Sequence, residues 1–173
     1  MAAAASTLAS ASSPPQRRAF PTTTAASKAG KPRRHVNPLL VRRLRRTVWY
    51  WQTVMGIRRR SMLKAPLHAT RALRYWRRQA RSVARLAAHP PHKAGWLCIH
   101  RYEGSWRDSG DPYWGGLQMD RGFMRTYAPR LLLRRGWANR WTALEQMWVA
   151  ERAHRSGRGY WPWPNTARAC GLI

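Results

Sequence analysis

Apolar residues recur at helical spacing in two stretches of the first half of the chain. Between Leu39 and Arg60 the steps are 3, 4, 3 and 4 residues, and between Ala69 and Ala87 they are 4, 3, 4, 3 and 4. This spacing is typical of an amphipathic helix, and arginines occupy the other faces. We therefore predict two basic helices joined by a connection from Gly56 to Pro66. Their apolar stripes are Val41, Leu44, Val48, Trp51 and Met55, and Ala69, Leu73, Trp76, Ala80, Val83 and Ala87.

The second half of the chain predicts shorter elements. The sequence His89-Pro90-Pro91-His92 ends the second helix, because proline cannot continue it, and we interpret it as a linker rather than a pair of metal ligands. A short helix is predicted from Trp96 to Tyr102, with Gly104 as its terminator. Residues 108–111 form a turn, and the paired glycines within residues 113–119 favour a short hairpin.

A longer helix is predicted from Thr142 to His154. Thr142 and Glu145 have the spacing of a capping box, and apolar residues follow at helical intervals. The remaining segment, residues 157–173, reads as an aromatic return that contains proline.

The charge is large and unevenly distributed. The 173 residues include 33 Lys and Arg and only 6 Asp and Glu, for a net charge of +27. Small soluble domains usually carry a charge of about 2 to 8 in magnitude. Residues 1–97 contain 21 of the basic residues and none of the acidic ones. Such a region repels itself and gains most from an anionic partner, such as lipid headgroups, nucleic acid or a cell-wall polymer. The alternative is a helical hairpin whose stripes pack together and whose arginines are solvated.

Composition divides the chain into three regions. Residues 1–38 are rich in Ala, Ser, Thr and Pro and predict a disordered tail. Residues 39–93 form the basic helical region and linker, and residues 94–173 hold 8 of the 11 tryptophans, a density suited to a small core and an aromatic cleft. We expect no membrane-spanning segment, because no uncharged apolar run approaches about 20 residues. No clear signal peptide is visible either.

Four blocks in the last region, taken in order, resemble the transglycosylase-like catalytic domain of the actinobacterial resuscitation-promoting factors. They cover about 78 of the 173 residues. The resemblance implies a lysozyme-like fold that cleaves the glycan of peptidoglycan. The predicted class is α+β, mainly α, a small domain with a short β-hairpin. The blocks are Cys98–Trp106 (CIHRYEGSW), Tyr113–Asp120 (YWGGLQMD), Glu145–Arg152 (EQMWVAER), and Trp161–Pro162 with Ala167–Cys170.

The resemblance also assigns individual residues. Glu103 matches the catalytic glutamate, and Tyr113, Gln118 and Asp120 match residues of the glycan-binding cleft, beside which we add Trp114 as an aromatic that can stack on a sugar. The two cysteines alone leave a single bridge or two free thiols open. Within this family we expect a Cys98–Cys170 disulfide, although the family's first cysteine normally lies directly before the glutamate. The family's Thr-Trp pair after the hairpin is here Phe123-Met124.

The chemistry of Glu103 can be argued from its neighbours as well. Cleavage of a glycosidic bond needs a proton donor, and a glutamic acid in an apolar pocket is a suitable one. Trp96, Tyr102 and Trp106 favour the protonated form, whereas the surrounding positive charge opposes it. The alternative is an ion pair with Arg101 or Arg107. We expect a single-acid mechanism, with no cofactor and no metal.

These observations leave three hypotheses for the function. The first is an extracellular or wall-associated lytic transglycosylase or muramidase that the basic helices hold on an anionic wall or membrane. The second is a cytoplasmic nucleic-acid-binding or ribosome-associated protein. The third is a membrane disruptor formed by the two amphipathic helices.

Overall fold

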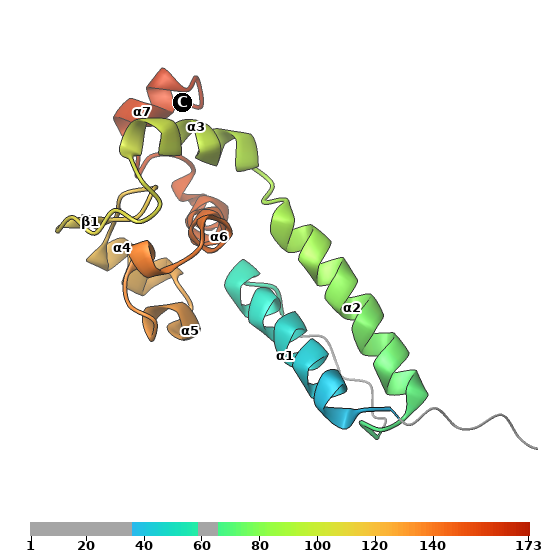
Figure 1. The fold of residues 1–173 in the computed structure, drawn as a ribbon. Coiled ribbons are helices and arrows are strands. Elements are labelled where there is room, and N and C mark those ends of the chain that lie inside the picture. The colour runs from blue at the N-terminus through green and yellow to red at the C-terminus, as the bar shows by residue number, and fades with distance from the viewer. Residues whose placement is uncertain (1–35, 59–65) are drawn as a thin grey trace, which may run out of the picture. The chain divides into compact units, whose positions relative to one another are not determined.

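The computed structural model describes residues 36–58 and 66–173, which are mostly helical with one short antiparallel hairpin (Figure 1). The predicted class, α+β and mainly α, is therefore confirmed. The predicted tail lies outside the described residues except for its last three. The elements are α1 (Pro38–Met55), α2 (Thr70–Ala88), α3 (Lys93–Glu103), β1 (Tyr113–Trp114), β2 (Met119–Asp120), α4 (Arg121–Tyr127), α5 (Arg130–Leu133), η1 (Ala138–Arg140), α6 (Ala143–Ala153), η2 (His154–Arg158) and α7 (Pro164–Ala169).

The ends of α1 follow from its capping residues. Asn37 is the N-cap, and its side chain accepts a hydrogen bond of 2.8 Å from the backbone N–H of Leu39, while Pro38 occupies the first turn, where no N–H is needed. The helix stops at Met55 because Gly56 adopts a left-handed conformation with φ of 68°. The predicted connection therefore begins at Gly56 as expected, and its residues 59–65 lie outside the described part of the chain.

The apolar stripes of α1 and α2 pack against each other, as in the alternative of a helical hairpin. Trp49 and Trp76 meet edge to face, with ring centroids 6.3 Å apart. One hollow is lined by Val48 and Gln79 and further along by Ile57 and Leu86, so the two helices run in the same direction (Figure 1). An antiparallel helical hairpin is thus not what forms. The buried stripe residues are Val41, Val48 and Met55 of α1 and Trp76, Val83 and Ala87 of α2.

Helix α6 packs against α1, α2 and α4. Its N-terminus carries the predicted capping box, in which Thr142 and Glu145 each bond to the other's backbone N–H. The indole N–H of Trp148 donates to the carbonyl of Ala87 at 2.9 Å, which joins α6 to the end of α2. Residues His35–Ile173 form one compact unit, so the change in composition near residue 94 falls inside it.

The remaining elements surround a two-stranded sheet. In the hairpin, Tyr113 pairs with Asp120 and Trp114 with Met119. Helix α3 begins at Lys93, three residues before the predicted start, and ends at Glu103 as expected. Helix α7 lies in the segment that was predicted to be an irregular return, and Pro164 occupies its first turn. None of the described helices has the length and apolar character needed to cross a membrane.

Candidate active site

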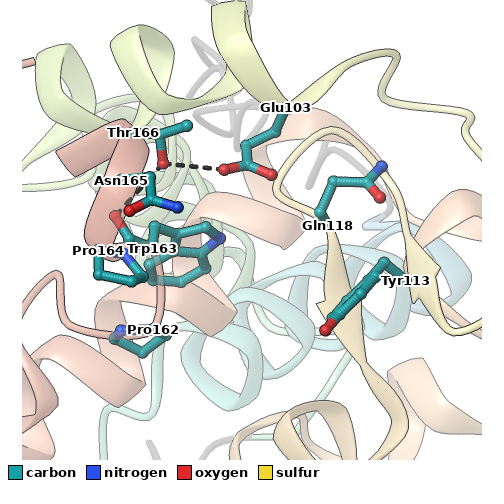
Figure 2. A pocket seen from close by; sticks show the side chains of 8 residues that line it. All are labelled: Glu103, Tyr113, Gln118, Pro162, Trp163, Pro164, Asn165 and Thr166. Atoms are coloured by element: carbon teal, nitrogen blue, oxygen red, sulfur yellow. Dashed lines mark hydrogen bonds between the residues drawn. The ribbon is translucent and has the colours of Figure 1, made fainter. Parts of the chain in front are cut away.

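A cleft of about 290 Å³ opens where three segments meet (Figure 2). The C-terminal end of α3 supplies Glu103, and the hairpin supplies Tyr113 and Gln118. The third wall comes from the segment that enters α7. The residues of this wall are Pro162, Trp163, Pro164, Asn165 and Thr166.

Glu103 is half-buried at the end of α3, and Gly104 follows it with φ of 123°. Its Oε1 accepts a hydrogen bond of 2.8 Å from the hydroxyl of Thr166. Arg101 and Arg107 are exposed. The ion pairs among the described residues involve Asp111, Glu145 and Glu151, not Glu103. The structure therefore gives no support to the alternative of an ion pair, and the carboxyl group is directed into the cleft (Figure 2).

Gln118 sits in the hairpin loop at a φ of 46°, a left-handed conformation that few residues other than glycine adopt. Its Nε2 donates to Asp108 Oδ2 at 2.7 Å and to the carbonyl of Gly115 at 3.0 Å. The backbone N–H of Gly110 and the amide of Gln118 lower the pKa of Asp108. The ionised Asp108 thus holds the side chain of Gln118 by a hydrogen bond, although Asp108 itself does not line the cleft.

Strand alternation separates the two aromatic residues of β1. Tyr113 is 49% exposed and lines the cleft, whereas Trp114 is 5% exposed and points to the opposite face. Trp114 packs beside Trp137, with ring centroids 5.8 Å apart, and the guanidinium of Arg121 lies over its ring. Trp114 does not line the cleft in which we predicted it to bind substrate.

Asp120 also lies outside the set of cleft-lining residues. It is the N-cap of α4, and its Oδ1 accepts a hydrogen bond of 2.7 Å from the backbone N–H of Phe123. An aspartate at an N-cap is favoured because it satisfies a helix N–H that has no other partner. This structural role accounts for the residue without a ligand.

Asn165 and Thr166 are cleft residues that the sequence did not reveal. They follow Pro164 in the first turn of α7, so the sequence signal that was available is a proline at a helix start. Trp163 also lines the cleft but is 5% exposed. Its indole N–H donates to the carbonyl of Leu117 at 2.6 Å, so Trp163 supports the cleft from beneath.

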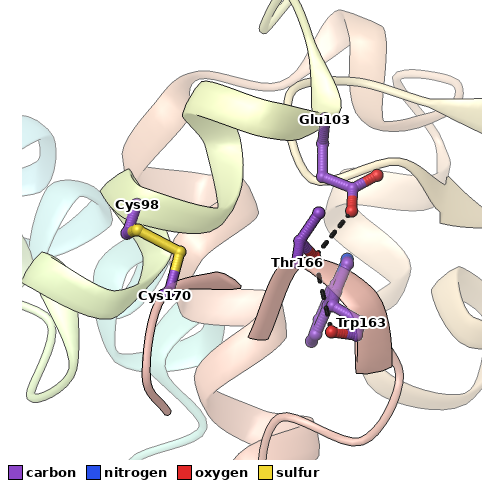
Figure 3. Close-up of a disulfide and its surroundings, with 5 residues drawn as sticks. All are labelled: Cys98, Glu103, Trp163, Thr166 and Cys170. Atoms are coloured by element: carbon purple, nitrogen blue, oxygen red, sulfur yellow. Dashed lines mark hydrogen bonds between the residues drawn. A yellow bond between two sulfur atoms is a disulfide. The ribbon is translucent and has the colours of Figure 1, made fainter. Parts of the chain in front are cut away.

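The expected disulfide is present. Cys98 of α3 and Cys170 at the end of α7 are bonded, with Cα atoms 6.1 Å apart and a separation of 72 positions in sequence (Figure 3). The bond joins the two helices that carry Glu103 and Thr166. It therefore holds opposite walls of the cleft together.

Gln146 attaches the hairpin to α6. It is fully buried, and its Oε1 accepts from the backbone N–H of Gly116 at 2.9 Å. Gly116 is pressed so closely onto Trp106 and His100 that an added Cβ would lie 2.7 Å and 2.5 Å from their rings. These contacts with Gln146, Trp106 and His100 thus fix the position of the hairpin. The Nε2 of Gln146 donates to the carbonyls of Trp106, Ala138 and Trp141 at 2.9, 2.9 and 3.3 Å.

A second feature lies on α2, away from the residues of the cleft. Arginines from one face of the helix line a hollow of about 390 Å³. All six acidic residues of the chain lie in its described part, and none forms an ion pair with these arginines. The hollow is therefore strongly positive. Its residues are Arg74, Arg77, Arg78, Arg81 and Arg85, which we call the arginine face.

Within residues 36–58 and 66–173, no group of three or more His, Cys, Asp or Glu side chains is placed to hold a metal ion. The expectation of a reaction without cofactor stays a prediction. Comparison of the chain with known protein families, with curated proteins and with solved structures found no match. The resemblance to resuscitation-promoting factors, and the lysozyme-like fold that it implies, likewise stay predictions.

Proposed function

We propose that the cleft cleaves the glycan strand of peptidoglycan, as a lytic transglycosylase or muramidase, with Glu103 as the general acid and base. The observation that carries this proposal is the meeting of Glu103, Tyr113 and Gln118 in one cleft. A half-buried carboxyl group can supply a proton, and an exposed tyrosine beside it can stack on a sugar ring.

The first step is a proton transfer. The protonated Glu103 gives its proton to the glycosidic oxygen while the bond from that oxygen to the anomeric carbon breaks. The leaving sugar keeps the electron pair and the proton as a hydroxyl group. The anomeric carbon is left as an oxocarbenium-like centre.

The second step returns the proton. Either water or the 6-hydroxyl of the same sugar attacks the anomeric carbon, and the Glu103 carboxylate accepts the proton that the attacking oxygen loses. Water gives a reducing end, and the 6-hydroxyl gives an anhydro sugar. Among the residues that line the cleft, Glu103 is the one carboxyl group, which favours a single-acid route over a carboxylate pair.

The test is the release of soluble fragments from purified peptidoglycan. Glu103→Gln keeps the size and the hydrogen-bonding capacity of the side chain but removes the acid, and we expect activity to fall at least about 100-fold. Asp111→Asn, an equivalent change at the exposed Asp111–Arg121 ion pair, is the matched control and should keep full activity. Unchanged activity of Glu103→Gln would refute the proposal, and mass spectrometry of the fragments separates the two products.

The disulfide supports an extracellular or wall-associated location for this enzyme, because such bonds persist in oxidising compartments. The arginine face gives the proposed enzyme a means of holding an anionic wall polymer. Insertion into a membrane is a weaker proposal, since the apolar stripes of α1 and α2 are buried against each other.

The arginine face also favours one second candidate, a nucleic-acid-binding protein. Guanidinium groups pair well with phosphates, and each phosphate contact on duplex DNA adds about 0.9 to the slope of log affinity against log salt. Arg77→Gln with Arg81→Gln should lower that slope by about 2, whereas Arg130→Gln with Arg134→Gln on α5 is the matched control for net charge. A shallow slope for the unmodified chain would exclude this candidate.

A further inference from the structure

Thr166 lies between two oxygen atoms and has only one hydroxyl proton. Its Oγ1 is 2.8 Å from Glu103 Oε1 and 3.3 Å from the carbonyl oxygen of Trp163. A hydroxyl group donates one hydrogen bond and can accept others. Only one of the two oxygens can therefore accept a full hydrogen bond from Thr166 at a given moment.

Glu103 Oε1 can accept the hydrogen bond from Thr166 in both protonation states of the carboxyl group. When Glu103 is ionised, it can only accept, so Thr166 donates to it. When Glu103 carries its proton on Oε2, Oε1 is a carbonyl-type oxygen that still accepts from Thr166, so the acidic hydrogen stays available to the substrate and the bond from Thr166 to Trp163 is not needed. The carbonyl of Trp163 does not depend on this bond, because the backbone N–H of Ala167 also donates to it at 2.8 Å.

The position of Thr166 is fixed independently of Glu103. Thr166 lies in α7, and the backbone N–H of Cys170 donates to the carbonyl of Thr166 at 2.9 Å. Cys170 is bonded to Cys98, which lies on α3 five residues before Glu103 (Figure 3). The hydroxyl and the carboxyl group are thus held by two covalently joined helices.

We propose that Thr166 is a positioning residue whose hydroxyl donates to Glu103 Oε1 in both protonation states, so that Oε2 carries the proton that is given to the substrate and later taken back. This inference rests on the proposed glycosidic cleavage, in which Glu103 must serve first as an acid and then as a base. A partner that accepted a hydrogen bond from the carboxyl group would instead draw the acidic proton away from the substrate.

The experiment compares Thr166→Val, which has the same shape but no hydroxyl, with Thr166→Ser, which keeps it. Rates are measured on soluble peptidoglycan fragments across pH. Thr126→Val on α4 is the matched control, because the exposed Thr126 also bonds a carbonyl of its own helix, that of Gly122 at 2.8 Å. Glu103→Gln is included to establish that the measured activity belongs to this site.

We expect Thr166→Val to lower kcat by about 10-fold or more with little change in KM, since the hydroxyl acts on the acid rather than on the substrate. The hydrogen bond from Thr166 to the ionised carboxylate is stronger than the one to the protonated acid, so its loss disfavours ionisation of Glu103. The alkaline limb of the pH profile then moves to higher pH by roughly half to one unit. Thr166→Ser and Thr126→Val should match the unmodified protein in both respects.

Two outcomes would overturn the inference while leaving the enzyme assignment intact. One is a Thr166→Val variant that behaves like the unmodified protein. The other is a lower kcat with an unmoved alkaline limb, which would assign Thr166 a purely structural role. A fully active Glu103→Gln would instead overturn the proposed function itself.

Discussion

Gln146 offers a sharp test of how the cleft is supported, because its side chain is fully buried and its bonds are directional. Oε1 accepts one bond and Nε2 donates to three carbonyl groups. Gln146→Leu has a similar volume but leaves the N–H of Gly116 and the carbonyl groups without this partner. A buried polar group without a partner costs about 1 to 3 kcal/mol, so we expect a loss of roughly 3 to 5 kcal/mol in the free energy of unfolding.

Gln146→Glu makes the test depend on pH. One carboxyl oxygen can still accept from Gly116, but the other faces carbonyl oxygens that need a donor. The ionised form is therefore repelled, and burial together with these carbonyls raises the pKa of the introduced carboxyl group above its usual value of about 4.3. A group whose pKa is raised in the folded state destabilises it at high pH. The penalty decreases as pH falls through the raised folded value and is smallest below about 4.3.

The assay is denaturant unfolding of the variants and the unmodified protein at about pH 4 and about pH 7. Relative to the unmodified protein at the same pH, Gln146→Glu should lose more than about 3 kcal/mol at neutral pH and about 1 to 2 kcal/mol at acid pH. Gln146→Leu should lose the same amount at both. Equal losses for Gln146→Glu at both pH values, or a loss below about 1 kcal/mol at neutral pH, would refute the role given to this side chain.

Three further expectations concern stability. Replacing Cys98 and Cys170 together by alanine should cost roughly 4 kcal/mol in denaturant unfolding, because the bridge closes a separation of 72 residues; a loss under about 1 kcal/mol would contradict this. Burial and the neighbouring His92 lower the pKa of His154 below 6.5, so the folded state binds fewer protons and stability should fall as pH drops below about 6.5. His154→Asn should reduce the dependence of the melting temperature on pH, and an unchanged dependence would contradict this role of His154. Gly116→Ala should lower the melting temperature, since its Cβ would overlap two rings; an unaltered value would mean that the hairpin can shift.

The periodicity of the sequence was sufficient to find α1 and α2 but not to orient them. Helix α1 has 18 residues and is about 27 Å long. The 14 residues between Met55 and Thr70 can extend to about 46 Å, so the connection can return along the whole helix or turn back at once. The apolar spacing fits either direction, and the structure has the parallel arrangement, in which Trp49 packs against Trp76.

The sequence predicted the cleft residues that lie close together along the chain but not those from a distant segment. Glu103, Tyr113 and Gln118 lie within 16 residues of one another, and a single hairpin after α3 brings them together. Thr166 is 63 residues from Glu103, and nothing local in the sequence indicates that they meet. Trp114 and Asp120 do not line the cleft, and local rules could have indicated this for both. Neighbouring strand residues face opposite sides, and an aspartate before a helix is a common N-cap.

The few acidic residues explain how so basic a chain folds around α6. Glu145 accepts hydrogen bonds from Tyr50 of α1 and from Arg135, the latter at 2.8 Å; burial raises its pKa, but these bonds outweigh burial and lower it overall. Glu151 is fully buried and accepts from His92 and Trp96 at the start of α3. Glu145 thus joins α6 to α1, and Glu151 joins α6 to α3, while none of the ion pairs among the described residues involves the arginine face of α2. Because like charges on that face repel one another, an anionic ligand bound there should stabilise the fold as well as occupy the site.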